Sequence, residues 1–145
     1  MDRKREVVAH AVERVKQKKL ETPVEILAEI GGFEIATMVG VYLGGMEERI
    51  PIVMDGVIST VAGLVAYKME KTVVDYMFAS HVSGEPAGRL ALEAMGLEGI
   101  IHGKMCLGEG TGAMTLFPIL DMAIAVYENM GSFADYAIDP YERFV

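Results

Sequence analysis

Cysteine, basic residues and metal-binding patterns are all scarce in this chain of 145 residues, and each shortage excludes a class of protein. The single cysteine, Cys106, rules out a disulfide within the chain and is typical of a reducing compartment, so we expect a cytoplasmic protein. Lys and Arg number 13 against 21 Asp and Glu, and a net charge of −8 argues against nucleic-acid binding. The scattered histidines have no metal-ligand spacing, so we expect no metal site.

Long apolar runs are also missing, although apolar residues make up 52% of the chain. A membrane-spanning helix needs roughly 18 uninterrupted apolar residues, and polar residues or Pro118 interrupt the longest candidates, 56–67 and 110–120. We therefore expect no membrane association, and we attribute the excess apolar surface to a subunit interface or to a further portion of chain. No Walker or G-x-G-x-x-G pattern occurs, and we expect no cofactor.

The order of the expected elements predicts one domain, 1–145, with a helix-rich α/β architecture. This is a Rossmann-like layered fold in which helices flank a short parallel sheet. Apolar spacing and capping signals predict helices over residues 1–19, 23–30, 33–47, 59–69, 86–96 and 112–130. Thr22 and Glu25 form a capping box at the start of the second helix, and Pro86 and Gly96 mark the start and end of the fifth. Apolar runs at residues 50–54 and 76–79 predict neighbouring parallel strands, and a third strand is expected at residues 104–107.

Polar residues follow both of the predicted strands, where open α/β sheets bind their ligands. Asp55 and Gly56 follow the first strand, and Ser80 and His81 follow the second, so we expect them to line a binding pocket. Asp55 is otherwise a turn residue or a helix cap, and His81 is otherwise structural. We discount a Ser-His-Asp triad, because adjacent Ser and His side chains rarely point at each other and no nucleophile elbow is present.

Two glycine-rich turns precede predicted helices. Gly31 and Gly32 either bind a phosphate at a helix start or form a tight corner between two helices. The second turn holds a lone carboxylate, and its residues are Leu107, Gly108, Glu109, Gly110, Thr111, Gly112 and Ala113. Such a loop brings a ligand close to backbone N–H groups. Its Glu109 is therefore either a base or ligand anchor in a substrate pocket, or a charge that stabilises the helix start.

Four motifs follow one another along the chain, at residues 30–36 (Ile-Gly-Gly-Phe-Glu-Ile-Ala), 51–56 (Pro-Ile-Val-Met-Asp-Gly), 80–86 (Ser-His-Val-Ser-Gly-Glu-Pro) and 107–113 (Leu-Gly-Glu-Gly-Thr-Gly-Ala). In their order and spacing they resemble the nicotinate-nucleotide:dimethylbenzimidazole phosphoribosyltransferase family. The resemblance runs from the first helix almost to the last residue. It implies that Glu109 is the catalytic base. The residues expected to contact substrates are Gly31, Gly32, Asp55, Gly56, Ser80, His81, Leu107, Gly108, Gly110, Thr111 and Gly112.

The resemblance implies transfer of the phosphoribosyl group of nicotinate mononucleotide to 5,6-dimethylbenzimidazole, or to another benzimidazole-type base. The products are α-ribazole 5′-phosphate and nicotinate, in cobalamin biosynthesis. One ring nitrogen of the base attacks C1′ while the other loses its proton, which a carboxylate within hydrogen-bond reach can accept. We expect Met105, Leu107 and Met114 to give this carboxylate a partly apolar wall.

The family's chains are much longer, so the resemblance implies that this chain is a C-terminal portion. An N-terminal half, in the same polypeptide or as a separate partner, then supplies part of the pocket. We also expect a homo-oligomer, most simply a homodimer, that covers apolar helices. The alternative function is a non-catalytic binding or assembly domain of the same family, inactive without the N-terminal half.

Overall fold

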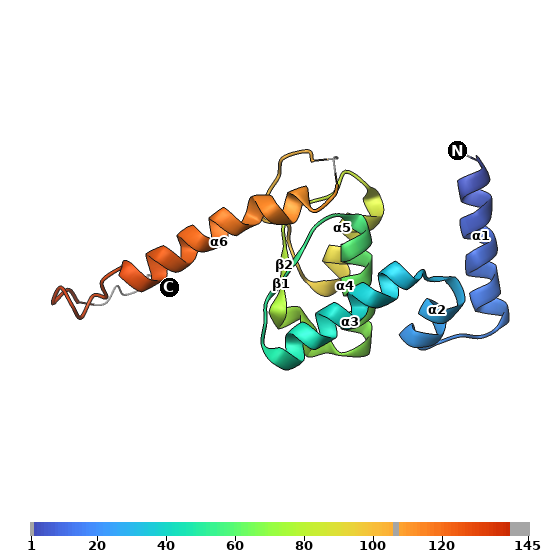
Figure 1. The fold of residues 1–145 in the computed structure, drawn as a ribbon, viewed down its shortest axis with the longest axis horizontal. Helices are drawn as coiled ribbons and strands as arrows, with labels where there is room; N and C mark the ends of the chain where they lie inside the picture. Colours follow the sequence, from blue (N-terminus) through green and yellow to red (C-terminus); the bar gives the residue numbers. More distant parts are fainter. Residues whose placement is uncertain (1, 106–107, 140–145) are drawn as a thin grey trace.

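Helices dominate the architecture and surround one small sheet (Figure 1). The computed structural model describes residues 2–105 and 108–139. Along these residues the elements are α1 (Asp2–Gln17), α2 (Pro23–Ile30), α3 (Phe33–Glu48), β1 (Ile52–Met54), α4 (Val57–Met69), the 3₁₀-helix η1 (Lys71–Tyr76), β2 (Met77–Ala79), α5 (Pro86–Met95) and α6 (Thr111–Asn129). Figure 1 shows α3, α4 and α5 gathered beside the sheet, α1 and α2 at one end, and α6 projecting at the other. The predicted helix-rich α/β class is confirmed.

The two strands pair in parallel, as predicted, and their C-terminal ends lie side by side. Ile52 pairs with Met77 and Met54 pairs with Ala79. The N–H of Ser80 then donates to the carbonyl of Met54 at 3.3 Å, which continues the ladder by one step. Because α4 and η1 fill the connection between the strands, the residues after β1 and β2 meet at one edge of the sheet.

The expected third strand at residues 104–107 is wrong in its described part. Pairing with the end of β2 comes instead from Ile101, which forms a parallel bridge with His81. The N–H groups of Ile100 and Ile101 donate to the carbonyls of Ala79 and Ser80 at 3.1 and 2.8 Å. Lys104 has a φ of 49°, a left-handed conformation that does not belong in a strand. Cys106 and Leu107 lie outside the described residues.

The core lies between the sheet and the helices that pack beside it. Its buried side chains are Val39, Tyr42, Met54, Ala62, Ala66, Val73, Met77, Ala79, Leu92 and Met95. Small residues on α4 let the helix approach the sheet closely: a Cβ on Gly63 would overlap the methyl group of Met54. This packing fixes β1 against α4, and so fixes the segment between them that carries Asp55 and Gly56.

The N-terminal helices follow the predicted caps. Thr22 and Glu25 form the expected capping box, with the Glu25 N–H donating to Thr22 Oγ1 at 3.2 Å and the Thr22 N–H donating to the Glu25 carboxylate at 3.1 Å. Arg14 on α1 and Lys18, just after it, form ion pairs with Glu29 on α2 at 3.0 and 2.6 Å. These ion pairs hold the pKa of Glu29 below its usual value, with Lys18 contributing most.

Helix α6 contacts the rest of the chain mainly through its first turns. It runs from Thr111 to Asn129 without a break at Pro118, and only Gly112 and Leu116 are buried on it. Its exposed apolar side chains include Met114, Phe117, Met122, Ile124, Val126 and Tyr127, the last with 87% of its surface exposed. Within the described part of the chain, no helix combines the length and apolarity that crossing a membrane requires.

Candidate active site

The site is built where β1 ends, around the half-buried carboxylate of Asp55. The backbone there is held on both sides: the Asp55 N–H donates to Ser59 Oγ at 2.9 Å, and the Asp55 carbonyl accepts from Ser80 Oγ at 3.2 Å. Ser59 in turn donates to the carbonyl of Gly56 at 2.9 Å. This network holds the backbone of Asp55 and Gly56 at the junction of β1 and α4.

The carboxylate of Asp55 reaches across the sheet edge to the start of α6. Its Oδ2 accepts the N–H of Gly110 at 3.2 Å, and its Oδ1 accepts the N–H groups of Gly112 and Ala113 at 2.8 and 3.2 Å. The first N–H groups of a helix have no partner within the helix, and its N-terminus favours negative charge. The glycine-rich sequence predicts that these N–H groups face a ligand, whereas in the structure they bond Asp55.

Ser80 and His81 lie next to this junction. Ser80 is fully buried and His81 is 8% exposed. Ser80 Oγ lies 3.0 Å from His81 Nδ1, so the adjacent side chains do point at each other, contrary to the argument used against a triad. The triad is nevertheless not assembled, because the Asp55 carboxylate is bound to α6 and Ser80 Oγ donates to the Asp55 carbonyl.

The imidazole of His81 packs against the α6 start, where Gly112 leaves space for it. A Cβ on Gly112 would overlap His81 Nδ1 and Cε1 and would lie 2.8 Å from Asp55 Oδ1. The absence of a side chain at Gly112 therefore lets His81 and Asp55 both contact the helix start. When the Ser80 hydroxyl proton goes to the Asp55 carbonyl, His81 Nδ1 donates to Ser80 Oγ.

Two cavities flank the loop that precedes α6. One, of about 390 Å³, is lined by His81, Ser83, Glu85 and Met105; the other, of about 330 Å³, by Met38, Asp55, Ile58 and Glu109. Gly56 and Gly108 line both cavities. The strand-end residues and the glycine-rich loop therefore converge at one place, as the strand order predicted.

Glu109 lies exposed at the tip of this loop with a φ of 56°. Among the described residues, its carboxylate accepts no hydrogen bond from a neighbour, and the flanking Gly108 and Gly110 also have positive φ. The expected apolar wall differs from the observed one. Met114 is 66% exposed, Met105 lines the other cavity, and the apolar neighbours of the Glu109 cavity are Met38, Val57 and Ile58. Leu107 lies outside the described residues.

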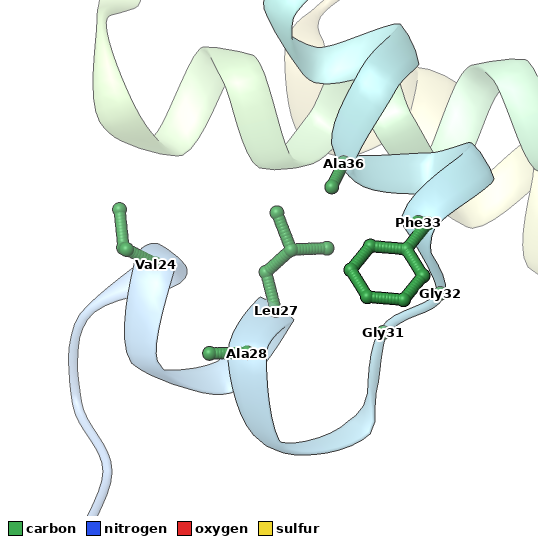
Figure 2. Close-up of a pocket in the computed structure, with 7 residues that line it drawn as sticks. All are labelled: Val24, Leu27, Ala28, Gly31, Gly32, Phe33 and Ala36. Carbon is green, nitrogen blue, oxygen red and sulfur yellow. The ribbon is translucent and has the colours of Figure 1, made fainter.

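Gly31 and Gly32 belong to a different part of the surface. They end α2 and start α3, and they line an apolar cavity of about 310 Å³ together with Val24, Leu27, Ala28, Phe33 and Ala36 (Figure 2). The carboxylate of Glu34 lies next to Gly32 at the start of α3. An apolar lining and a nearby carboxylate suit the corner between two helices better than a phosphate site.

Sequence reasoning did not identify two residues that support the site. Tyr42 is buried, and its hydroxyl donates to the Ser59 carbonyl at 3.1 Å. Burial, with the Asp55 charge acting in the same direction, raises the pKa of Tyr42 to about 12. Ser59 lies four residues after Asp55, and this spacing at a strand-to-helix turn was a usable signal for its bond to the Asp55 N–H. In the described part of the chain, no cluster of His, Cys, Asp or Glu side chains is arranged to hold a metal ion.

Comparison with known proteins decides the family. A family model described as "Phosphoribosyltransferase" matches residues 1–138. The chain belongs to this phosphoribosyltransferase family. The family resemblance drawn from the four motifs is thereby confirmed.

Relatives of this phosphoribosyltransferase chain carry a more specific name. The nicotinate-nucleotide--dimethylbenzimidazole phosphoribosyltransferase of Acetivibrio thermocellus is 40% identical over 142 residues, which are 98% of this chain and 40% of that protein. The protein of the same name from Clostridium acetobutylicum is 42% identical over 137 residues, 94% of this chain and 39% of that protein. The chain therefore spans about 40% of the length of these curated relatives.

The fold of the phosphoribosyltransferase chain also has a solved counterpart. The crystal structure of CobT from Thermus thermophilus matches it with a TM-score of 0.85 at 38% sequence identity. The match covers 97% of this chain and 41% of the CobT chain. The described elements are thus arranged as in a segment of the larger CobT chain.

Proposed function

We propose that this chain is the part of a nicotinate-nucleotide:dimethylbenzimidazole phosphoribosyltransferase that carries the catalytic base, Glu109. The complete protein would transfer phosphoribose from nicotinate mononucleotide to 5,6-dimethylbenzimidazole and release α-ribazole 5′-phosphate and nicotinate. The names of relatives at 40% and 42% identity support this activity. Because the chain spans only about 40% of their length, activity requires the portion that they have in addition.

The proposal depends on the backbone conformation of Glu109 and on its exposed carboxylate, to which no described residue donates a hydrogen bond. A non-glycine residue with positive φ is disfavoured by about 1–2 kcal/mol, so glycine would fit this position with less strain. The loop nevertheless has a glutamate there, exposed at the rim of a cavity and without a hydrogen-bond donor among the described residues. A cap charge would be expected to bond the helix start, but Asp55 already accepts those N–H groups.

The chemistry assigned to Glu109 is removal of one proton. A nitrogen of dimethylbenzimidazole uses its lone pair to form a bond to C1′ of the ribose. The C1′–nitrogen bond of nicotinate mononucleotide breaks, and its electron pair leaves with nicotinate. The second ring nitrogen then carries an N–H whose proton passes to the Glu109 carboxylate, so the product base is neutral. Attack from the face opposite the leaving group gives the α-linkage.

Substrate contacts in this proposal come from the residues around the two cavities. Gly56, Ser80, His81, Gly108, Gly110, Thr111 and Gly112 form the surroundings of the loop. The described residues that line the two cavities include Asp55, Glu85 and Glu109 but neither Lys nor Arg. A phosphate group is normally bound by cations or free N–H groups. Its binding therefore calls for groups outside this set, in agreement with a site completed by a further portion of chain.

We also propose that α6 and the corner at Phe33 are covered in the complete protein, most simply in a homodimer. Phe33 is 93% exposed and Tyr127 is 87% exposed, and apolar side chains surround Tyr127 on α6. Large exposed apolar side chains gathered on one helix are typical of an interaction site. Light scattering of the complete protein measures its mass, and a clean monomer with these side chains exposed would contradict the proposal.

Location in the cytoplasm stays a prediction that rests on the single cysteine.

The test of the catalytic role uses a complete protein, made by replacing the matching segment of the Acetivibrio thermocellus relative with this chain. Nicotinate mononucleotide and dimethylbenzimidazole are supplied, and α-ribazole 5′-phosphate is measured by chromatography. Glu109→Gln keeps the shape of the side chain and removes the base, so kcat should fall by about 10²–10⁴-fold, the usual contribution of a general base. The KM for nicotinate mononucleotide should change little.

The matched control is Glu48→Gln, the same change at an exposed position at the end of α3, which should leave kcat unaltered. A Glu109→Gln protein with the turnover of the unmodified protein would remove the base assignment. An unmodified assembled protein that binds both substrates without forming product would favour the non-catalytic alternative instead.

A further inference from the structure

We propose that Asp55 is a positioning residue whose carboxylate holds the glycine-rich loop at the start of α6 and thereby orients Glu109. The inference rests on the proposed role of Glu109 as the base. It assigns to Asp55 a function different from substrate binding, which its place after β1 suggested. Asp55 acts in this view through the backbone of residues 110–113 and does not touch the reacting atoms.

Asp55 bonds residues that are far away in the sequence, so the contact joins two separate parts of the site. The three N–H groups that Asp55 accepts lie 55, 57 and 58 residues later in the sequence. Both carboxylate oxygens are used: Oδ2 bonds Gly110, the residue directly after Glu109, and Oδ1 bonds Gly112 and Ala113. The base-bearing loop is therefore tied on its C-terminal side to the end of β1.

The anchor itself is held in place from two sides. Ser59 Oγ accepts the Asp55 N–H at 2.9 Å, and Ser80 Oγ donates to the Asp55 carbonyl at 3.2 Å. Ser80 follows β2 and is fully buried, so the backbone that carries the carboxylate is bonded to both strands of the sheet. A rigid support of this kind is what a base needs, because a misplacement of about 1 Å can lower a rate by 10²-fold.

The chemistry of the contact requires a carboxylate. An ionised carboxylate only accepts hydrogen bonds, whereas an amide has one oxygen and an NH₂ group that donates. In Asp55→Asn, the NH₂ group must face either the Gly110 N–H or the pair from Gly112 and Ala113. At least one of the three hydrogen bonds is then lost. The favourable interaction of a negative charge with the helix N-terminus is lost as well.

The first experiment measures backbone amide exchange in the chain itself by NMR. In the unmodified chain, the amides of Gly110, Gly112 and Ala113 should exchange at least about 10-fold more slowly than in an unstructured peptide, although the first turn of a helix offers them no acceptor. Asp55→Asn should accelerate exchange at one or more of these three sites by about 10-fold or more, while amides of α4 keep their rates.

The matched control for this measurement is Asp75→Asn, which removes the same charge at an exposed position in η1 and should leave all three amides protected. Cooperative thermal unfolding of each variant checks that it is folded. If Asp55→Asn does not fold, the unmodified chain still decides the question. Unprotected amides at all three sites would overturn the anchor, and so would unchanged protection in a folded Asp55→Asn chain.

The second experiment separates positioning from substrate binding in the assembled protein. Asp55→Asn should lower kcat by about 10–10²-fold and change the KM of either substrate less than about 3-fold. In the Glu109→Gln background the same change should lower kcat by less than about 3-fold, because the two residues act through one group. Independent, multiplicative effects, or a raised KM with unaltered kcat, would overturn the proposal.

The two proposals fail in different ways. Without product formation by the unmodified assembled protein, the base assignment of Glu109 and the positioning role both fall, while the exchange data still decide whether Asp55 holds the loop. Full activity of the unmodified protein, together with multiplicative effects of the two substitutions, would retain Glu109 as the base and reject Asp55 as its positioning residue.

Discussion

Gly112→Ala should destabilise the chain, although alanine is the better helix former. The added Cβ would overlap His81 Nδ1 and Cε1 and lie 2.8 Å from Asp55 Oδ1. Gly112 is buried at the first turn of α6, and Asp55 and His81 are held by the sheet edge, so neither can move away freely. The helix start or the His81 imidazole must shift instead.

The magnitude follows from three contributions. Forcing one additional carbon into a packed site destabilises by about 1–3 kcal/mol. Displacing the imidazole breaks the contact of 3.0 Å between Ser80 Oγ and His81 Nδ1, a hydrogen bond worth about 0.5–1.5 kcal/mol. The higher helix propensity of alanine stabilises the variant by at most about 1 kcal/mol. The free energy of unfolding should therefore fall by about 0.5–4.5 kcal/mol.

Gly40→Ala is the matched control, because it makes the same change inside α3, where no atom lies within 4 Å of the new Cβ. This variant should be more stable by about 0.5–1 kcal/mol. Urea unfolding followed by circular dichroism measures both changes, and the slope m checks that the transitions are comparable. The reasoning is refuted if Gly112→Ala unfolds at the same or a higher urea concentration than the unmodified chain.

Further predictions concern a buried phenol and a helix cap. The raised pKa of Tyr42, about 12, means that folding favours the neutral phenol. Its contribution is complete below about pH 10 and is lost between about pH 10 and 12, a fall of about 3 kcal/mol in the free energy of unfolding. Tyr42→Phe should remove that dependence and Tyr127→Phe, at an exposed position, should keep it, as urea titrations across this pH range would reveal. Thr22→Ala breaks the capping box and should lower stability by about 1 kcal/mol, whereas Thr37→Ala on the exposed face of α3 should change it by less than about 0.5 kcal/mol in the same assay.

Local signals predicted much of the fold. The capping box at Thr22, Pro at the start of α5 and Gly96 at its end are determined by neighbours within a few residues, and the structure has all three. The error at residues 104–107 arose where pairing depends on a distant partner. Apolar character alone does not say that Ile101 pairs with β2, or that Lys104 has a left-handed backbone.

The site was predictable in its location but not in its connections. Strand order brought Asp55, Gly56 and His81 to the same edge as the loop of Glu109. That Asp55 bonds the start of α6 could not be read from spacing, because a contact between residues 55 or more positions apart is set by tertiary packing. Helix-start N–H groups also look the same in a sequence whether a ligand or a carboxylate of the protein binds them.

The projection of α6 has a mechanical consequence. The helix has 19 residues and a length of about 28 Å, and its buried side of Gly112 and Leu116 lies at the end next to Glu109. It is therefore a lever whose short arm carries the loop and whose long arm ends near Tyr127. A partner that binds at Tyr127 would push or pull on α6, and the hydrogen bonds between Asp55 and the helix start would resist that movement. We therefore expect the partner bound at Tyr127 to influence the orientation of the loop.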